Sequence, residues 1–336
     1  MVAAIPAAAG GAATGETLFQ SGSREPVPLR GVPLRGETGL RLVVADNPPF
    51  VLDVDTESVT PVPGIPAMER GVLWVVGASG AAVVVAESVQ RHADLYAVRG
   101  HGARVSSLGT GAAVAPAPDG RAVWVKSFVD GSHCTLRQVG LDGRRLRGPR
   151  AFPCGTTIDP GGGLGLVANR TRVLDPRTGR TVLTTRWGIL AAAGDKLVLS
   201  GPGRQLTLLD AETGAQRRLP WPSVLPRIDQ PAVEPRGRLV ALGFANPWTG
   251  SGQALDVWLL DTETGKLTQL PGMPALVSLK FTSMAWTDDG RLVLLAQSNK
   301  RDIVVVWQTG RQRLALKSVQ LPERGDSGSD SFALLR

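Results

Sequence analysis

The chain has 336 residues, 43% of them hydrophobic and 20% charged, with a formal charge of +8 at neutral pH. This apolar content excludes wholesale disorder, and no charge-free apolar run reaches the roughly 18 residues that a membrane-spanning helix needs. The 41 glycines and 25 prolines interrupt the chain at short intervals and argue against long helices.

The positive charge does not predict a nucleic-acid partner. Arginine supplies most of it, a bias also typical of GC-rich genomes, and basic residues such as those of 137–150 alternate with apolar ones. No helix-turn-helix, zinc-finger or RNA-recognition motif is present. We therefore expect no specific binding of nucleic acid.

Residues 1–38 lack regular alternation and are predicted to form a flexible stem or linker, a possible tether to a membrane. The apolar stretch 72–86 contains Gly-Ala-Ser-Gly at its centre, which predicts two strands joined by a turn.

An internal repeat follows, consisting of an apolar strand that ends in Asp and a turn with Thr-Gly. The Asp side chain is expected to cap backbone N–H groups of a hairpin turn, and Gly supplies a positive φ. Clear copies start at Val173, Leu208 and Leu259, and weaker ones at Asp53, Val98, Val139 and Val306.

A second marker, a Gly or Asp just before a buried strand, alternates with the first. It occurs at Gly39, Gly71, Gly120, Gly163, Asp195, Gly237 and Gly290. The 251 residues from Gly39 to Gly290 cover six intervals, or about 42 residues per repeat. Two markers with this period predict an all-β fold, a seven-bladed β-propeller with four antiparallel strands per blade.

On its D-x-x-T-G and D-G-R turns, the chain resembles bacterial seven-bladed β-propellers of the TolB-like and WD40-like superfamily over residues 39–336. It lacks the Trp-Asp dipeptide of true WD40 repeats and their Gly-His pair at blade starts. The resemblance implies the fold and leaves the function open.

The C-terminus predicts how the ring closes. Innermost strands are expected at Ala67-Met68, at Ala232-Val233 and at Ser283 to Trp286, and residues 331–336 repeat their pattern. We expect residues 331–336 to complete the first blade, which removes two unpaired sheet edges.

Cys134 and Cys154 are the only cysteines and lie symmetrically about the turn at residues 141–144. Residues equidistant from a hairpin turn face one another, so we predict a disulfide. A disulfide favours an extracytoplasmic protein, secreted or tethered, and two reduced thiols in a cytoplasmic protein are the alternative.

Signals for catalysis are weak. No metal site, cofactor motif or nucleophile–base pair is recognisable, and we predict no catalytic residue, metal or cofactor. An enzyme of the lyase or glycoside hydrolase type remains the alternative. Its acid and base would come from loop residues, namely His92, His101, His133, Asp46, Asp94, Asp130, Asp229 and Asp302.

The leading hypothesis is a monomeric, non-enzymatic binding or scaffolding module that presents a loop face to a protein, peptide or glycan. Loops expected at 243–253 and 296–302, with the inter-blade segment 220–222, place aromatic and basic residues on one rim. The predicted binding residues are Trp221, Asn246, Trp248, Lys300 and Arg301.

Overall fold

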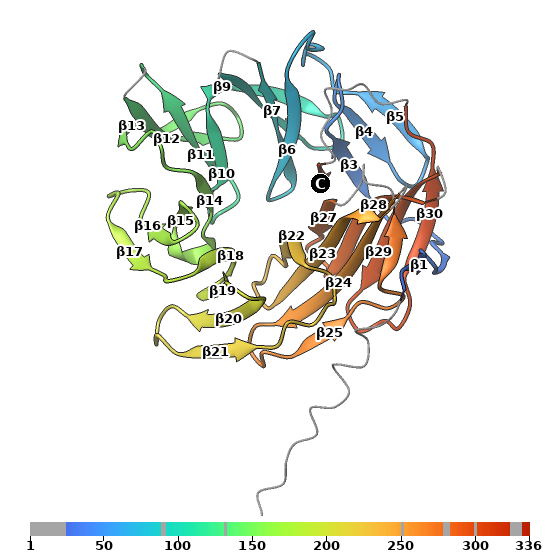
Figure 1. Ribbon diagram of the computed structural model, residues 1–336. Coiled ribbons are helices and arrows are strands. Elements are labelled where there is room, and N and C mark those ends of the chain that lie inside the picture. Colours follow the sequence, from blue (N-terminus) through green and yellow to red (C-terminus); the bar gives the residue numbers. More distant parts are fainter. Residues whose placement is uncertain are drawn as a thin grey trace, which may run out of the picture.

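The structure is a computed structural model that describes residues 25–88, 92–130, 133–249, 252–277, 283–298, 301–322 and 331–336. Seven antiparallel sheets are arranged radially around one axis (Figure 1). The predicted all-β, seven-bladed propeller is confirmed. No helix in these ranges is long and apolar enough to cross a membrane.

Blades 1 to 4 occupy the first half of the chain. Blade 1 contains β31 (Phe332–Leu335), β3 (Arg41–Val44), β4 (Phe50–Asp53) and β5 (Ser58–Pro61). Blade 2 contains β6 (Val72–Ala78), β7 (Ala81–Glu87), β8 (Ala93–Arg99) and β9 (Arg104–Gly111). Blade 3 contains β10 (Ala113–Pro116), β11 (Ala122–Phe128), β12 (Cys134–Gly140) and β13 (Arg145–Phe152). Blade 4 contains β14 (Ile158–Pro160), the 3₁₀ turn η2 (Gly162–Leu164), β15 (Leu166–Ala168), β16 (Arg172–Leu174) and β17 (Thr181–Thr184).

Blades 5 to 7 complete the ring. Blade 5 contains β18 (Gly188–Ala193), β19 (Lys196–Gly201), β20 (Gln205–Asp210) and β21 (Gln216–Leu219). Blade 6 contains β22 (Arg227–Val233), β23 (Leu239–Thr249) and β24 (Gly252–Asp261), and its outer position is divided between β25 (Leu267–Gln269) and β26 (Ala275–Val277). Blade 7 contains β27 (Ser283–Trp286), β28 (Arg291–Ser298), β29 (Arg301–Gln308) and β30 (Ala315–Val319).

Ring closure occurs as the sequence predicts. Strand β31 pairs antiparallel with β3, with Phe332 opposite Val44 and Leu335 opposite Arg41. Phe332 is 4% exposed and packs into the apolar layer between blades 1 and 7. The last strand therefore forms the innermost strand of the first blade.

The Asp-containing turns also form as predicted. The Asp210 carboxylate accepts hydrogen bonds from the backbone N–H groups of Glu212 (3.1 Å) and Thr213 (2.7 Å), and Gly214 has a φ of 73°. The carboxylate of Asp261 caps its turn in the same way. This chemistry fixes the hairpin between the third and fourth strands of the blades that carry the motif.

Blade 2 differs from the prediction. Ala67 and Met68 form no strand, because the Asn47 side chain bonds both the N–H (2.7 Å) and the carbonyl (2.6 Å) of Met68. The innermost strand is β6, so Gly71 precedes the first strand of its blade. Gly80, with a φ of 74°, precedes the second strand and occupies the position of the marker.

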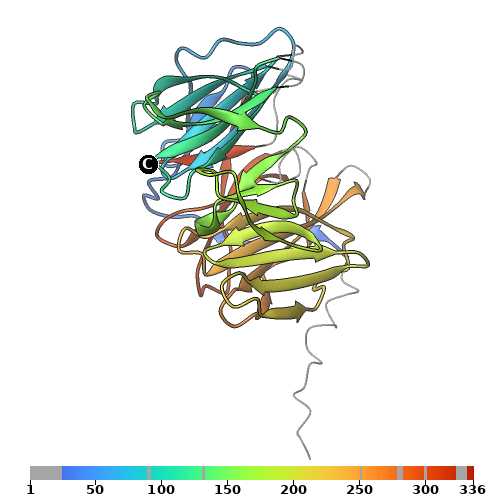
Figure 2. The same ribbon diagram turned by 90° about the vertical axis from the view of Figure 1, so that its left-hand side faces the viewer.

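An N-terminal strap, residues 25–38, runs along the outer edges of blades 6 and 7 (Figures 1 and 2). Strand β1 (Val27–Pro28) pairs in parallel with β26, and β2 (Val32–Pro33) pairs in parallel with β30. The N–H of Val32 donates to the carbonyl of Leu314 at 2.9 Å. These two strands lie within the predicted stem, and the sequence analysis did not anticipate them.

The predicted disulfide is present in blade 3, where the Cα atoms of Cys134 and Cys154 are 5.0 Å apart. Two register shifts between β12 and β13 move the pairing, so that Cys134 lies opposite Phe152 in the ladder. Beside the disulfide, the buried Lys126 ammonium donates to the carbonyls of Cys154 and Thr156. Burial lowers the pKa of Lys126.

Candidate functional site

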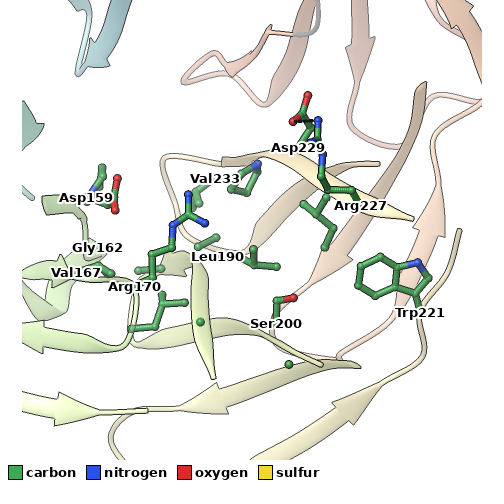
Figure 3. Close-up of a pocket in the computed structure, with 18 of the residues that line it drawn as sticks. Asp159, Gly162, Val167, Arg170, Leu190, Ser200, Trp221, Arg227, Asp229 and Val233 are labelled. Carbon is green, nitrogen blue, oxygen red and sulfur yellow. Dashed lines mark hydrogen bonds and ion pairs between the residues drawn. The ribbon is translucent and has the colours of Figure 1, made fainter. Parts of the chain in front are cut away.

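A cavity of about 890 Å³ opens beside the inner strands of blades 4, 5 and 6, and Gly77 of blade 2 and Pro116 of blade 3 complete its lining (Figure 3). It lies on the loop face, which we define as the face that carries the turns between the second and third strands of each blade. Its charged lining residues are Asp159, Arg170, Arg204, Arg227 and Asp229, and its other lining residues include Leu190, Ser200, Trp221 and Val233.

Asp159 belongs to β14, the innermost strand of blade 4, which directs residues of this strand toward the propeller axis. Its carboxylate is reached by solvent but is enclosed by the concave wall of the cavity. This partial desolvation raises the pKa of Asp159, and the nearby charge of Arg170 opposes the shift. Asp159 therefore holds a proton more readily than an ordinary surface carboxylate does.

Two hairpin turns of one type supply the arginines at the rim. In the turn from β15 to β16, Asn169 and Arg170 have φ values of 50° and 57°. In the turn from β19 to β20, Gly203 and Arg204 have φ values of 66° and 60°. Positive φ at both central residues defines a type I′ turn, in which Gly is usual at the second position. Arginine occupies that position in both blades.

The blade 6 side of the cavity is formed by an ion pair and an aromatic ring. The Arg227 guanidinium lies 3.1 Å from the Asp229 carboxylate, both on β22. The Trp221 indole N–H donates to the carbonyl of Leu225 at 3.1 Å, and its ring meets Phe244 edge-to-face at 5.0 Å. Trp221 is thus fixed by packing while one part of it borders the cavity.

The other predicted binding residues lie outside the cavity lining. Asn246 is half-buried in β23 opposite Ala254, and Arg301 is exposed at the start of β29. Lys300 and the side chain of Trp248 lie outside the described residues. Of the predicted set, the structure therefore places only Trp221 in the lining of this cavity.

The loops expected at 243–253 and 296–302 are mostly strand. Pairing in β23 and β24 continues from Leu239 opposite Asp261 to Thr249 opposite Gly252, with a register shift that spans Pro247. The prediction of long loops was wrong, because ladder hydrogen bonds persist through the Asn-, Pro- and Gly-rich segment. The two hairpins do project from the same loop face, as expected.

The histidines lie away from the cavity. His133 pairs with Asp130 at 2.8 Å in the turn after β11, and both side chains are more than half exposed. His92 contacts the Phe128 ring edge-to-face at 6.3 Å. Neither these residues nor His101 lines the cavity. In the described part of the chain, no cluster of three His, Cys, Asp or Glu side chains is arranged to hold a metal.

Asp256 is a buried carboxylate of blade 6 with a structural role. It accepts hydrogen bonds from the Trp258 indole (2.9 Å) and the Gln269 amide (2.8 Å). Burial raises the pKa of Asp256, and these donors oppose the shift. Its bonds join β24 to β25 and leave it outside the cavity lining.

Sequence reasoning missed the rim arginines and Asp159, and it included Asp229 only among several loop carboxylates. One signal was present in the chain. The dipeptides Asn169-Arg170 and Gly203-Arg204 occur at hairpin positions about one blade apart, with arginine at a turn position that favours Gly.

Comparison with known proteins supports the fold. No protein-family profile matches the chain, and no curated protein matches it in sequence. A periplasmic gluconolactonase from Pseudomonas aeruginosa superposes with a TM-score of 0.53 and 16% identity, covering 88% of this chain and 99% of that one. A provisionally assigned 6-phosphogluconolactonase from Bacteroides fragilis gives a TM-score of 0.51 and 12% identity, covering 90% of this chain and 100% of that one.

A provisionally assigned TolB from Agrobacterium tumefaciens covers 88% of this chain and 94% of its own length, with a TM-score of 0.45 and 12% identity. At these identities the likeness concerns the fold alone.

Proposed function

We propose that the protein is a non-enzymatic, extracytoplasmic binding module whose ligand enters the cavity on the loop face. The observation that carries the proposal is the convergence of Asp159, Arg170, Arg204 and the Arg227–Asp229 pair on one cavity of about 890 Å³. Ligand pockets typically measure about 300–1,000 Å³ and combine an apolar lining with a few placed polar groups.

The cavity lining favours binding over covalent catalysis. Ser200 carries a hydroxyl there, and among the described lining residues no histidine or cysteine accompanies it. Nucleophilic catalysis requires a nucleophile beside a base. The disulfide Cys134–Cys154 favours an oxidising compartment, which supports an extracytoplasmic location.

Blocking the cavity tests this proposal. Ser200→Trp would fill part of the space, and Thr181→Trp, on the exposed outer strand β17, is the matched control. Peptide and glycan arrays probed with the wild-type protein should yield ligands that Ser200→Trp no longer binds and Thr181→Trp still binds. Ligands retained equally by both variants would place the binding surface elsewhere.

An enzyme that uses acid–base chemistry is the second candidate, and the raised pKa of Asp159 favours it because general acids require such a shift. Turnover of a panel of glycosides, acidic polysaccharides and lactones, abolished by Asp159→Asn in a folded protein, would establish this activity. Binding without turnover in the same panel would support the binding module.

A further inference from the structure

The two rim arginines share three properties. Arg170 and Arg204 both line the cavity, both are exposed, and both occupy the second central position of a type I′ turn. Among the described residues, neither guanidinium has a hydrogen-bond or ion-pair partner within the protein. Figure 3 shows the Arg170 side chain directed into the cavity on the side of Asp159.

Their backbone conformation carries a cost. A non-glycine residue at positive φ costs roughly 1 kcal/mol, and asparagine or glycine fits the position better. Of the described non-glycine residues with positive φ, the only arginines are these two, and both face the same cavity. The same unfavourable backbone conformation occurs at an arginine in each of two adjacent blades, and both arginines line one cavity. We take this as a sign that the arginine side chains have a function, because the turns themselves would form better with glycine or asparagine.

Arg238 provides a contrast within the chain. Arg238, on the opposite face between blades 6 and 7, lies 3.0 Å from Asp261 and 3.7 Å from Glu263. Its charge is therefore balanced by neighbouring carboxylates. The charges of Arg170 and Arg204 are not balanced in this way, apart from the more distant influence of Asp159 on Arg170.

Resting on the proposed function, we infer that the cavity binds an anionic carbohydrate. Its carboxylate or phosphate group would be held by Arg170 and Arg204, since guanidinium groups bind both oxyanions in bidentate geometry. Asp159 would accept hydrogen bonds from sugar hydroxyls, and the exposed part of Trp221 would supply an apolar wall. A neutral sugar would leave both guanidinium groups without a partner.

The test uses substitutions that suit the turns. Arg170→Asn and Arg204→Gly remove the charges while placing residues that favour positive φ, so the melting temperature should stay the same or rise. The control is Arg147→Ala on the exposed outer strand β13, which removes an arginine remote from the cavity. Isothermal titration measures affinity for four probes, namely tetragalacturonate, glucose 6-phosphate, cellotetraose and tetraglutamate.

We expect one of the two anionic probes with hydroxyl groups to bind the wild-type protein. The identity of that probe shows whether the cavity recognises a carboxylate or a phosphate group. Each rim variant should weaken that binding about tenfold or more, and Arg147→Ala should leave it unchanged. Raising the salt concentration from about 0.05 to about 0.5 M should weaken it as well. Cellotetraose should bind at least tenfold more weakly.

Other outcomes overturn the inference in distinguishable ways. Tight binding of cellotetraose or tetraglutamate that Ser200→Trp abolishes and the rim variants retain would preserve the binding module and refute an anionic sugar. Failure of both tetragalacturonate and glucose 6-phosphate to bind would also refute the inference. Binding that Ser200→Trp leaves intact would refute the proposed site itself.

Discussion

Removing the disulfide should lower the free energy of unfolding by about 3 kcal/mol. Cys134 and Cys154 are separated by 20 residues, and closing a loop of that length in the unfolded chain costs about 11 cal/mol/K of entropy. At an unfolding entropy of about 2.1 cal/mol/K per residue over residues 39–336, this stability corresponds to a melting temperature lower by about 5 °C. The Cys134→Ala/Cys154→Ala variant avoids burying a hydroxyl at Cys134, which is 3% exposed.

Differential scanning calorimetry with and without a reducing agent provides the measurement. Reduction should lower the melting temperature of the wild-type protein by about the same amount as the double substitution, and it should not affect the double variant. A shift below about 1 °C in both experiments would show that the cross-link does not constrain the unfolded chain as reasoned.

Three further results are expected. Phe332→Ala should cost about 3–5 kcal/mol in urea unfolding, because Phe332 is 4% exposed in the apolar layer where the ring closes; a cost below about 1 kcal/mol would contradict this closure. Gly31→Ala should cost about 1–3 kcal/mol, because the new Cβ would lie 2.6 Å from the carbonyl oxygen of Leu314 and displace the strap. Gly148→Ala, with open space around the new Cβ, is its control, and equal effects of both changes would argue against a tightly packed strap. Desolvation raises the pKa of Asp159 in the folded protein above its value of about 3.9 in the unfolded chain. The ionised carboxylate therefore destabilises the folded state at pH values above the folded pKa, and the effect disappears at pH values below about 3.9. Asp159→Asn should therefore raise the melting temperature at pH 7 and leave it unchanged at pH 3, and a gain that is equal at both pH values would refute this account.

Much of the fold was predictable because the blades carry local turn chemistry. Asp210 and Gly214 act within a few residues of each other, so their pattern is visible in a short window of sequence. The glycine marker gave a wrong assignment in blade 2, where two glycines fit the pattern equally well. Gly71 and Gly80 both have positive φ, at 140° and 74°, and both precede strands of blade 2.

The candidate site was much less predictable, because its charged and aromatic residues come from three different blades. Asp159 on blade 4 and Arg227 on blade 6 line one cavity only because the ring curves, and no local sequence pattern encodes that curvature. Trp221 was predicted because an aromatic residue in an inter-blade segment, outside the expected strands, is recognisable from sequence alone. Its hydrogen bond to Leu225 and its contact with Phe244 depend on how blade 6 packs.

The strap and the closing strand have a consequence for the order of folding. Val27 pairs with Ala275, and Arg41 pairs with Leu335. Strands near the start of the described chain therefore cannot complete their pairing until residues near its end have been synthesised. Blades 2 to 5 contain only sequence-local hairpins and can form while synthesis continues. Until β31 has left the ribosome, the inner edge of β3 has no partner strand. In crowded conditions this edge is where a second nascent chain could insert its own C-terminal strand and yield a swapped dimer.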